Sequence, residues 1–122
     1  MTFKQTLIIL AHALVGWALC AATMGIGMAL LTLNEALVIH MIAAPIFFGA
    51  ISQFYFRRFH YTTALQTALI FLGFVVAMDF FIVALLINRS FEMFASPLGT
   101  WLPFTLIFAS TYLTGRSMGV RI

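Results

Sequence analysis

The chain has 122 residues, of which 64% are apolar and only 7% are charged, and its formal net charge is +3 at pH 7. A water-soluble domain has about 25% charged and about 45–50% apolar residues, so this composition excludes a soluble globular protein. Disordered segments are polar, which excludes intrinsic disorder as well. The single cysteine, Cys20, excludes an internal disulfide and a zinc site built from cysteines.

Four long apolar stretches, taken in chain order, predict an all-α integral membrane protein. They cover about residues 7–33, 36–56, 63–87 and 97–114, and a helix needs about 20 residues to cross a bilayer. The period-two alternation of membrane-barrel strands is absent. We therefore expect a single domain, residues 1–122, that folds as a bundle of four transmembrane helices in two antiparallel hairpins.

The first apolar stretch is expected to be a retained helix, because its run is about twice as long as the roughly 7–15 residues of a signal-peptide core. It carries Ala21, Gly25 and Ala29 at four-residue spacing, and the third stretch repeats this spacing with Gly73 and Ala77. Small residues at this interval let helix backbones approach closely in lipid. We expect them to pack helices together, either within the chain or between subunits.

Basic residues predict the orientation of the chain in the membrane. The polar breaks between the stretches are residues 34–35, 57–60 and 88–90. With four spans, the two ends and the second break share one side, which then holds Lys4, Arg57, Arg58, Arg116 and Arg121, while Arg89 lies on the other. The positive-inside rule therefore predicts both termini in the cytoplasm and a location in the inner (cytoplasmic) membrane.

Asp79 is the strongest candidate for a functional residue. It lies nine residues before Asn88, which places it about 13 Å below the outer end of the third helix, close to the midplane of a core about 30 Å thick. A charge at that depth costs at least about 2.5–3.5 kcal/mol, and intramembrane carboxylates usually face a partner, a cavity or an ion path. Two interpretations stay open, an ion or proton site and a structural acid hydrogen-bonded across helices.

His40 is the second candidate, five residues past Glu35 and therefore about 7 Å inside the outer boundary of the second helix. Asp79 is about 6 Å deeper by the same measure, so the two side chains can pair if the second and third helices touch there. Imidazole titrates between about pH 5 and 8, which suits a proton relay; the alternative is an interfacial histidine that bonds to water or lipid headgroups. Glu35 and Glu92 would attract cations at the outer mouth.

These residues predict a small proton- or cation-binding transporter or channel-like protein. A first alternative is a non-catalytic subunit or assembly factor of a larger membrane complex, which acts through its helix faces. A second is a redox protein that binds haem or a metal through His12, His40 or some of the seven methionines.

Several other functions are not indicated by the sequence. No nucleophile–base set or phosphate-binding glycine loop is present, so we expect no enzymatic activity. The basic residues follow the membrane topology and form no soluble basic surface, so no nucleic acid is expected as a partner. The predicted partners are the lipid bilayer and either further copies of the chain or other membrane subunits, and no particular cofactor is indicated.

Overall fold

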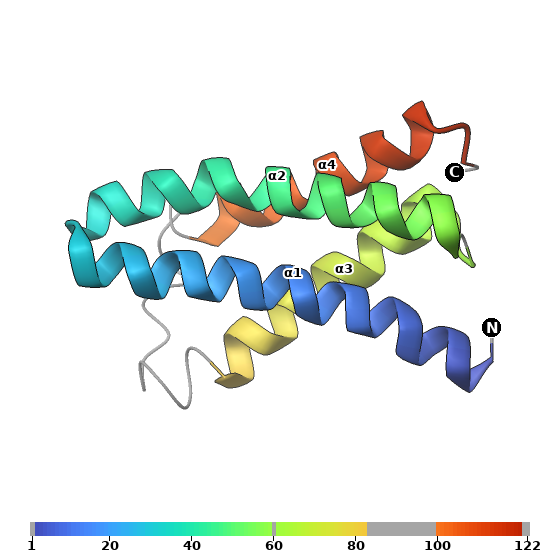
Figure 1. Ribbon diagram of the computed structural model, residues 1–122, viewed down its shortest axis with the longest axis horizontal. Helices are drawn as coiled ribbons and strands as arrows, with labels where there is room; N and C mark the ends of the chain where they lie inside the picture. Colours follow the sequence, from blue (N-terminus) through green and yellow to red (C-terminus); the bar gives the residue numbers. More distant parts are fainter. Residues whose placement is uncertain (1, 60, 83–99, 121–122) are drawn as a thin grey trace.

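The computed structural model describes residues 2–59, 61–82 and 100–120, and their regular secondary structure is helical (Figure 1). The elements are α1 (Phe3–Leu30), α2 (Leu33–Arg58), α3 (Ala64–Met78) and α4 (Leu102–Ser117). The all-helical fold that the composition predicts is therefore confirmed.

Three of these helices are long and apolar enough to cross a membrane. They are α1 with 28 residues, α2 with 26 residues, and α3 together with its helical continuation to Ile82, 19 residues in all. The described part of α4 has 16 residues, fewer than the about 20 that a span needs. The predicted start of the fourth span and the end of the third lie outside the described residues.

The helices form a bundle in which each packs mainly on two others. α1 packs on α2 and α3, and α4 packs on the same two helices. Figure 1 shows α1 and α2 side by side and running in opposite directions. The order around the bundle is therefore α1, α2, α4, α3, with α2 and α3 facing each other diagonally.

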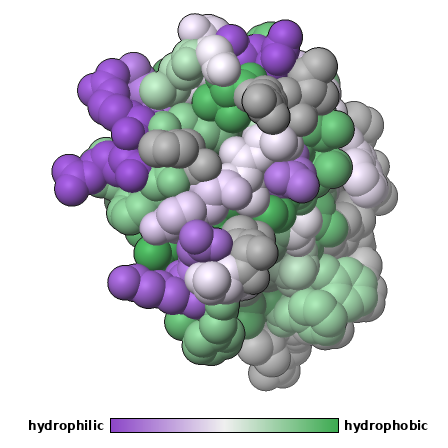
Figure 2. All heavy atoms as spheres, turned by 90° about the vertical axis from the view of Figure 1, so that its right-hand side faces the viewer, coloured by the Kyte–Doolittle hydropathy of each residue, from purple (hydrophilic) through white to green (hydrophobic). Residues whose placement is uncertain are grey.

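The amino-terminal end of the chain, the turn between α2 and α3 and the end of α4 lie together at one end of the bundle (Figure 1). We call it the basic end, because its described cations are Lys4, Arg57, Arg58 and Arg116. Figure 2 looks onto this end and shows hydrophilic side chains gathered around green apolar ones. Arginine and lysine at one end of long apolar helices are typical of the boundary between a bilayer and water.

The first three helices all begin with the same capping box. A threonine side chain accepts a hydrogen bond from the backbone N–H three residues later, and the Glu or Gln at that later position accepts one from the threonine backbone N–H. The three pairs are Thr2 with Gln5, Thr32 with Glu35 and Thr63 with Gln66. Each box satisfies two backbone N–H groups that the helix itself leaves unpaired.

The capping box at Thr32 corrects the predicted boundary between the first two helices. The polar pair at residues 34–35 is not a break, because α1 ends at Leu30 and α2 already begins at Leu33. Glu35 Oε1 accepts hydrogen bonds from the Thr32 backbone N–H at 3.3 Å and from the Thr32 hydroxyl at 2.9 Å. Asn34 and Glu35 are therefore the first turn of α2.

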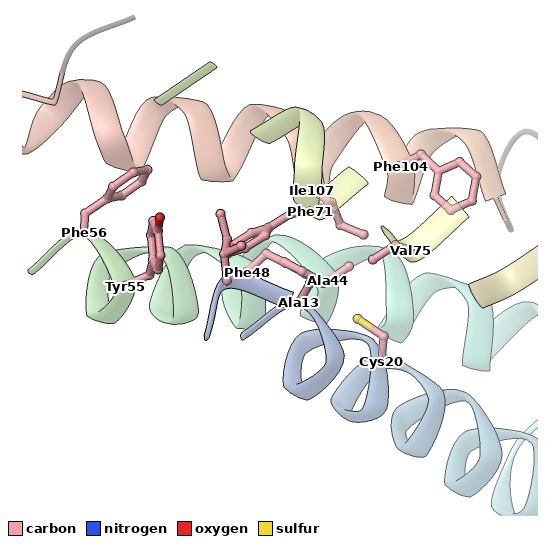
Figure 3. Packing of buried hydrophobic residues seen from close by; sticks show 11 residues of the cluster. Ala13, Cys20, Ala44, Phe48, Tyr55, Phe56, Phe71, Val75, Phe104 and Ile107 are labelled. Atoms are coloured by element: carbon pink, nitrogen blue, oxygen red, sulfur yellow. The ribbon is translucent and has the colours of Figure 1, made fainter. Parts of the chain in front are cut away.

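Aromatic rings and small residues fill the interior of the bundle (Figure 3). The ring of Phe48 on α2 packs 5.8 Å from the ring of Phe71 on α3, which in turn lies 6.2 Å from the ring of Tyr55. Gly16 makes room for this cluster, since a Cβ on it would lie 2.5 Å from Phe48. The rings of α2 thus meet α3 across the diagonal of the bundle.

A chain of buried hydroxyl groups joins α2 to α3 at the basic end. The Tyr55 hydroxyl lies 2.8 Å from the Thr62 hydroxyl, which lies 2.6 Å from the hydroxyl of Thr67. Thr67 also donates to the backbone carbonyl of Thr63 at 2.7 Å. Buried hydroxyls that lack partners are costly, so this chain stabilises one geometry of the turn.

Candidate functional site

Asp79 lies where the regular α-helical part of α3 ends. Residues 79–82 continue it as a π-helical turn, and the Asp79 backbone N–H donates to both the Val75 and the Val76 carbonyl groups. Such turns are rare and often occur at functional sites, because the wider turn alters the direction in which side chains point. The Asp79 side chain is half-buried.

Trp17 of α1 holds the Asp79 carboxyl group. Its indole Nε1–H donates a hydrogen bond of 2.9 Å to Asp79 Oδ1. At 1.5 Å per residue, Trp17 is about 21 Å from the start of α1 and about 20 Å from its end. Asp79 therefore meets the middle of the longest helix.

The partner of Asp79 is a neutral hydrogen-bond donor. The indole N–H orients one carboxylate oxygen but brings no positive charge, unlike an arginine or lysine. Cys20, one turn further along α1, is close enough to Asp79 for the two groups to interact electrostatically. The Cys20 side chain is 5% exposed, and Figure 3 shows its sulfur pointing into the apolar cluster. The candidate site is thus a carboxyl group that accepts a hydrogen bond from Trp17 and lies near the buried Cys20 thiol.

His40 does not form the predicted direct pair with Asp79. Within the described residues, no hydrogen bond links the two side chains, and Asp79 is bonded to Trp17 instead. The reason is the helix order, because α3 packs mainly on α1 and α4 while His40 is carried by α2. His40 Nδ1 is buried and has no hydrogen-bond partner in the part of the chain that the structure describes.

The two glutamates expected at the outer mouth have different outcomes. Glu35 caps α2 through Thr32, so its carboxylate already serves a structural role. Its side chain is exposed at the end opposite to the basic end. Glu92 lies outside the described residues.

The stripes of small residues lie mostly on the outside of the bundle. Gly25, Ala29, Gly73 and Ala77 are exposed, and Ala21 is half-buried. Within the described residues, a Cβ on Gly25 or Gly73 would meet nothing within 4 Å. The described helices therefore do not approach these two glycines closely, and their predicted packing role stays a prediction.

Close helix contacts are made by other glycines, which the sequence interpretation missed. A Cβ on Gly115 of α4 would lie 2.7 Å from the Ala64 Cβ of α3, and one on Gly27 of α1 would lie 3.0 Å from the Ala36 Cβ of α2. Together with Gly16 these positions let α1 and α4 approach their neighbours closely. Gly16 and Cys20 repeat the four-residue spacing of small residues on the buried face of α1. The same spacing therefore occurs on both the buried and the exposed face of this helix.

Trp17 is the residue of the candidate site that sequence reasoning did not find. A signal was available, because an indole N–H at apolar depth needs an acceptor, and backbone carbonyls within a helix are already paired. Asp79 is a side-chain acceptor within the predicted third span, so it was a candidate partner for this donor.

His12 lies in an aromatic cluster towards the basic end. Its ring is 5.8 Å from that of Phe54, 5.4 Å from Tyr55 and 5.3 Å from Phe59. Within the described residues there is no group of three or more His, Cys, Asp or Glu side chains able to hold a metal ion. The geometry thus adds no observation in favour of the haem or metal alternative.

Comparison with known proteins found no family model, no curated protein and no solved structure that matches this chain.

Proposed function

We propose that the chain is a small multi-pass membrane protein that binds a proton or a small cation at Asp79 and conducts it across the inner membrane. The observation that carries this proposal is the position of Asp79, which meets the middle of α1 and has the neutral Trp17 indole as its hydrogen-bond partner. Within the described residues, the hydrogen-bond partner of Asp79 is uncharged, and intramembrane carboxylates commonly mark ion or proton paths.

The proposal includes the full topology of four spans in two hairpins. The fourth span joins α4 to the residues before Leu102, and both termini lie in the cytoplasm. The clustering of Lys4, Arg57, Arg58 and Arg116 at one end of the bundle supports this orientation. Cytoplasmic and periplasmic reporter fusions at the two termini would test it directly.

The chemistry rests on the cost of an uncompensated charge. An ionised carboxylate at the bilayer centre costs at least about 2.5–3.5 kcal/mol, and binding a proton or a cation removes that charge. Trp17 is a positioning residue in this scheme, because its N–H holds Oδ1 and leaves the other oxygen for the incoming ion. The Cys20 thiol, which is 5% exposed, lies within electrostatic reach of the carboxyl group.

The test is dissipation of a pH gradient in proteoliposomes, with wild type compared with Asp79→Asn across a panel of cations. Asparagine keeps an oxygen that accepts the Trp17 hydrogen bond, so the variant removes the charge and keeps the contact. We expect flux in wild type and none in Asp79→Asn. Equal flux in both proteins would refute the proposal.

Gln66→Glu is the matched control, because it exchanges an amide and a carboxyl group at an exposed position. Gln66 caps α3 as Glu35 caps α2, so the capping box survives the change. This variant should conduct like wild type. That result would show that flux depends on the carboxyl group at position 79 and not on the net charge of the chain.

A second function, that of a subunit or assembly factor in a larger membrane complex, is favoured by the exposed small residues. Gly25 and Gly73 lie on helix faces that no other part of the described chain covers within 4 Å. Such faces suit close approach of another transmembrane helix. Native purification should then recover the chain with a partner at stoichiometric yield, and recovery of the chain alone would count against this function.

A further inference from the structure

An apolar groove of about 360 Å³ lies on the outside of the bundle between α1 and α2. Its lining consists of six residues, Ala11, His12, Val15, Ala50, Ile51 and Phe54. Val15 and Phe54 are each about half exposed, at 53% and 51%. His12 Nδ1 is already occupied, since it lies 2.7 Å from the Ile8 carbonyl oxygen. In a membrane-spanning chain, this groove faces the acyl chains of the bilayer.

Two cations flank the groove on the side of the basic end, one from each helix. Lys4 precedes Ala11 by seven residues, and Arg58 follows Phe54 by four residues. These intervals place each cation on the same face of its helix as the groove lining. The Arg58 guanidinium lies 5.6 Å from the centre of the Phe54 ring. Both cationic side chains are exposed.

The depth of the groove matches the upper part of a lipid acyl chain. α2 has 26 residues, so it is about 39 Å long and extends beyond a hydrocarbon core of about 30 Å. Phe54 is about 6 Å from the basic end of α2, and Ala11 is about 12 Å from the same end of α1. The cations thus lie at the level of lipid headgroups, with the apolar lining just below them.

We propose that Lys4, Arg58 and the groove between α1 and α2 form a binding site for an anionic phospholipid. The phosphate lies between the two cations, and one acyl chain follows the apolar lining. Charge complementarity selects the headgroup, because a zwitterionic lipid carries its own cation next to the phosphate. The groove does not include Asp79. Lipid binding there can therefore be tested separately from ion conduction.

The test is lipid binding to the purified full chain in a neutral detergent, measured by native mass spectrometry. Phosphatidylglycerol and phosphatidylcholine with identical acyl chains are titrated in parallel. Wild type should bind phosphatidylglycerol more tightly. Lys4→Gln and Arg58→Gln should each weaken phosphatidylglycerol binding about fivefold, the equivalent of the ~1 kcal/mol that one basic residue contributes at a membrane surface, and leave phosphatidylcholine unchanged.

Arg116→Gln is the matched control for charge. Arg116 lies at the basic end on α4, and α4 packs mainly on α2 and α3 rather than on α1. It should change phosphatidylglycerol binding less than twofold. Equal binding of the two lipids to wild type, or an effect of Arg116→Gln as large as that of Arg58→Gln, would overturn the proposal in favour of general surface attraction.

Variants that fill the groove test whether an acyl chain binds in it. Ala50 is exposed, so Ala50→Phe fills the groove without disturbing the interior and should weaken both lipids. Ala77→Phe, the same change at an exposed position of α3, should weaken neither. Millimolar inorganic phosphate should not displace phosphatidylglycerol. Displacement by phosphate, or no effect of Ala50→Phe, would show that the site recognises an anion alone and would overturn the lipid assignment.

Discussion

Replacement of Gly16 by alanine tests which face of α1 lies inside the bundle. A Cβ at this position would lie 2.5 Å from Cζ and 2.7 Å from Cε1 of Phe48. The Phe48 ring cannot easily retreat, because it is fully buried and packs 5.8 Å from the ring of Phe71. Overpacking of this kind costs about 1–3 kcal/mol, and the better helix propensity of alanine returns at most about 1 kcal/mol. With the full return subtracted, we expect a net loss of up to about 2 kcal/mol in the free energy of unfolding.

Gly25→Ala is the matched control on the same helix, since a Cβ there meets no atom of the described residues within 4 Å. It should leave stability unchanged or raise it by up to about 1 kcal/mol. The assay is equilibrium unfolding in mixed micelles of sodium dodecyl sulfate and a neutral detergent, followed by far-ultraviolet circular dichroism.

A third variant identifies the cause of the Gly16→Ala loss. Phe48→Leu shortens the side chain that the new Cβ would meet, so Gly16→Ala should cost less in the Phe48→Leu background than in wild type. The reasoning is refuted if Gly25→Ala destabilises as much as Gly16→Ala, or if Phe48→Leu does not reduce the cost of Gly16→Ala.

Two further changes test the polar contacts inside the bundle by the same unfolding assay. Trp17→Phe removes the donor to Asp79 and should cost about 0.6 kcal/mol and at most about 1.7 kcal/mol, the average and the maximum found for hydrogen bonds between membrane helices; a similar cost in an Asp79→Leu background would contradict the contact. Tyr55→Phe breaks the buried bond to Thr62 and should cost about 1 kcal/mol, whereas Tyr61→Phe at an exposed position should stay within about 0.5 kcal/mol.

Much of the local structure of this chain can be predicted from short segments of sequence. The starts of α1, α2 and α3 each follow a Thr-x-x-Glu or Thr-x-x-Gln pattern, whose hydrogen bonds join residues only three positions apart. The predicted break at residues 34–35 was wrong because polarity was weighed without this pattern. Residue counting along one helix predicts the depth of Asp79 in the membrane, and the structure adds its contact with Trp17 in the middle of α1.

The partners of these residues could not be predicted in the same way. His40 and Trp17 both have ring nitrogens suited to a bond with Asp79, and the choice depends on whether α3 packs on α2 or on α1. The helices of this chain are apolar on nearly all sides, so hydrophobic periodicity does not reveal their inner faces. For the same reason the stripe at Gly25 could not be told from the stripe at Gly16.

The sequence by itself determined that this chain is helical and apolar enough for a membrane, and its Thr-x-x-Glu or Thr-x-x-Gln patterns mark the starts of α1, α2 and α3. These properties depend on composition and on bonds between near neighbours. Only the tertiary structure decided that Trp17 holds Asp79, that Gly16 rather than Gly25 lies inside, and that Lys4 and Arg58 flank one groove. Each of these depends on the order and rotation of helices around the bundle, which the fit of side chains such as Phe48 against Gly16 determines.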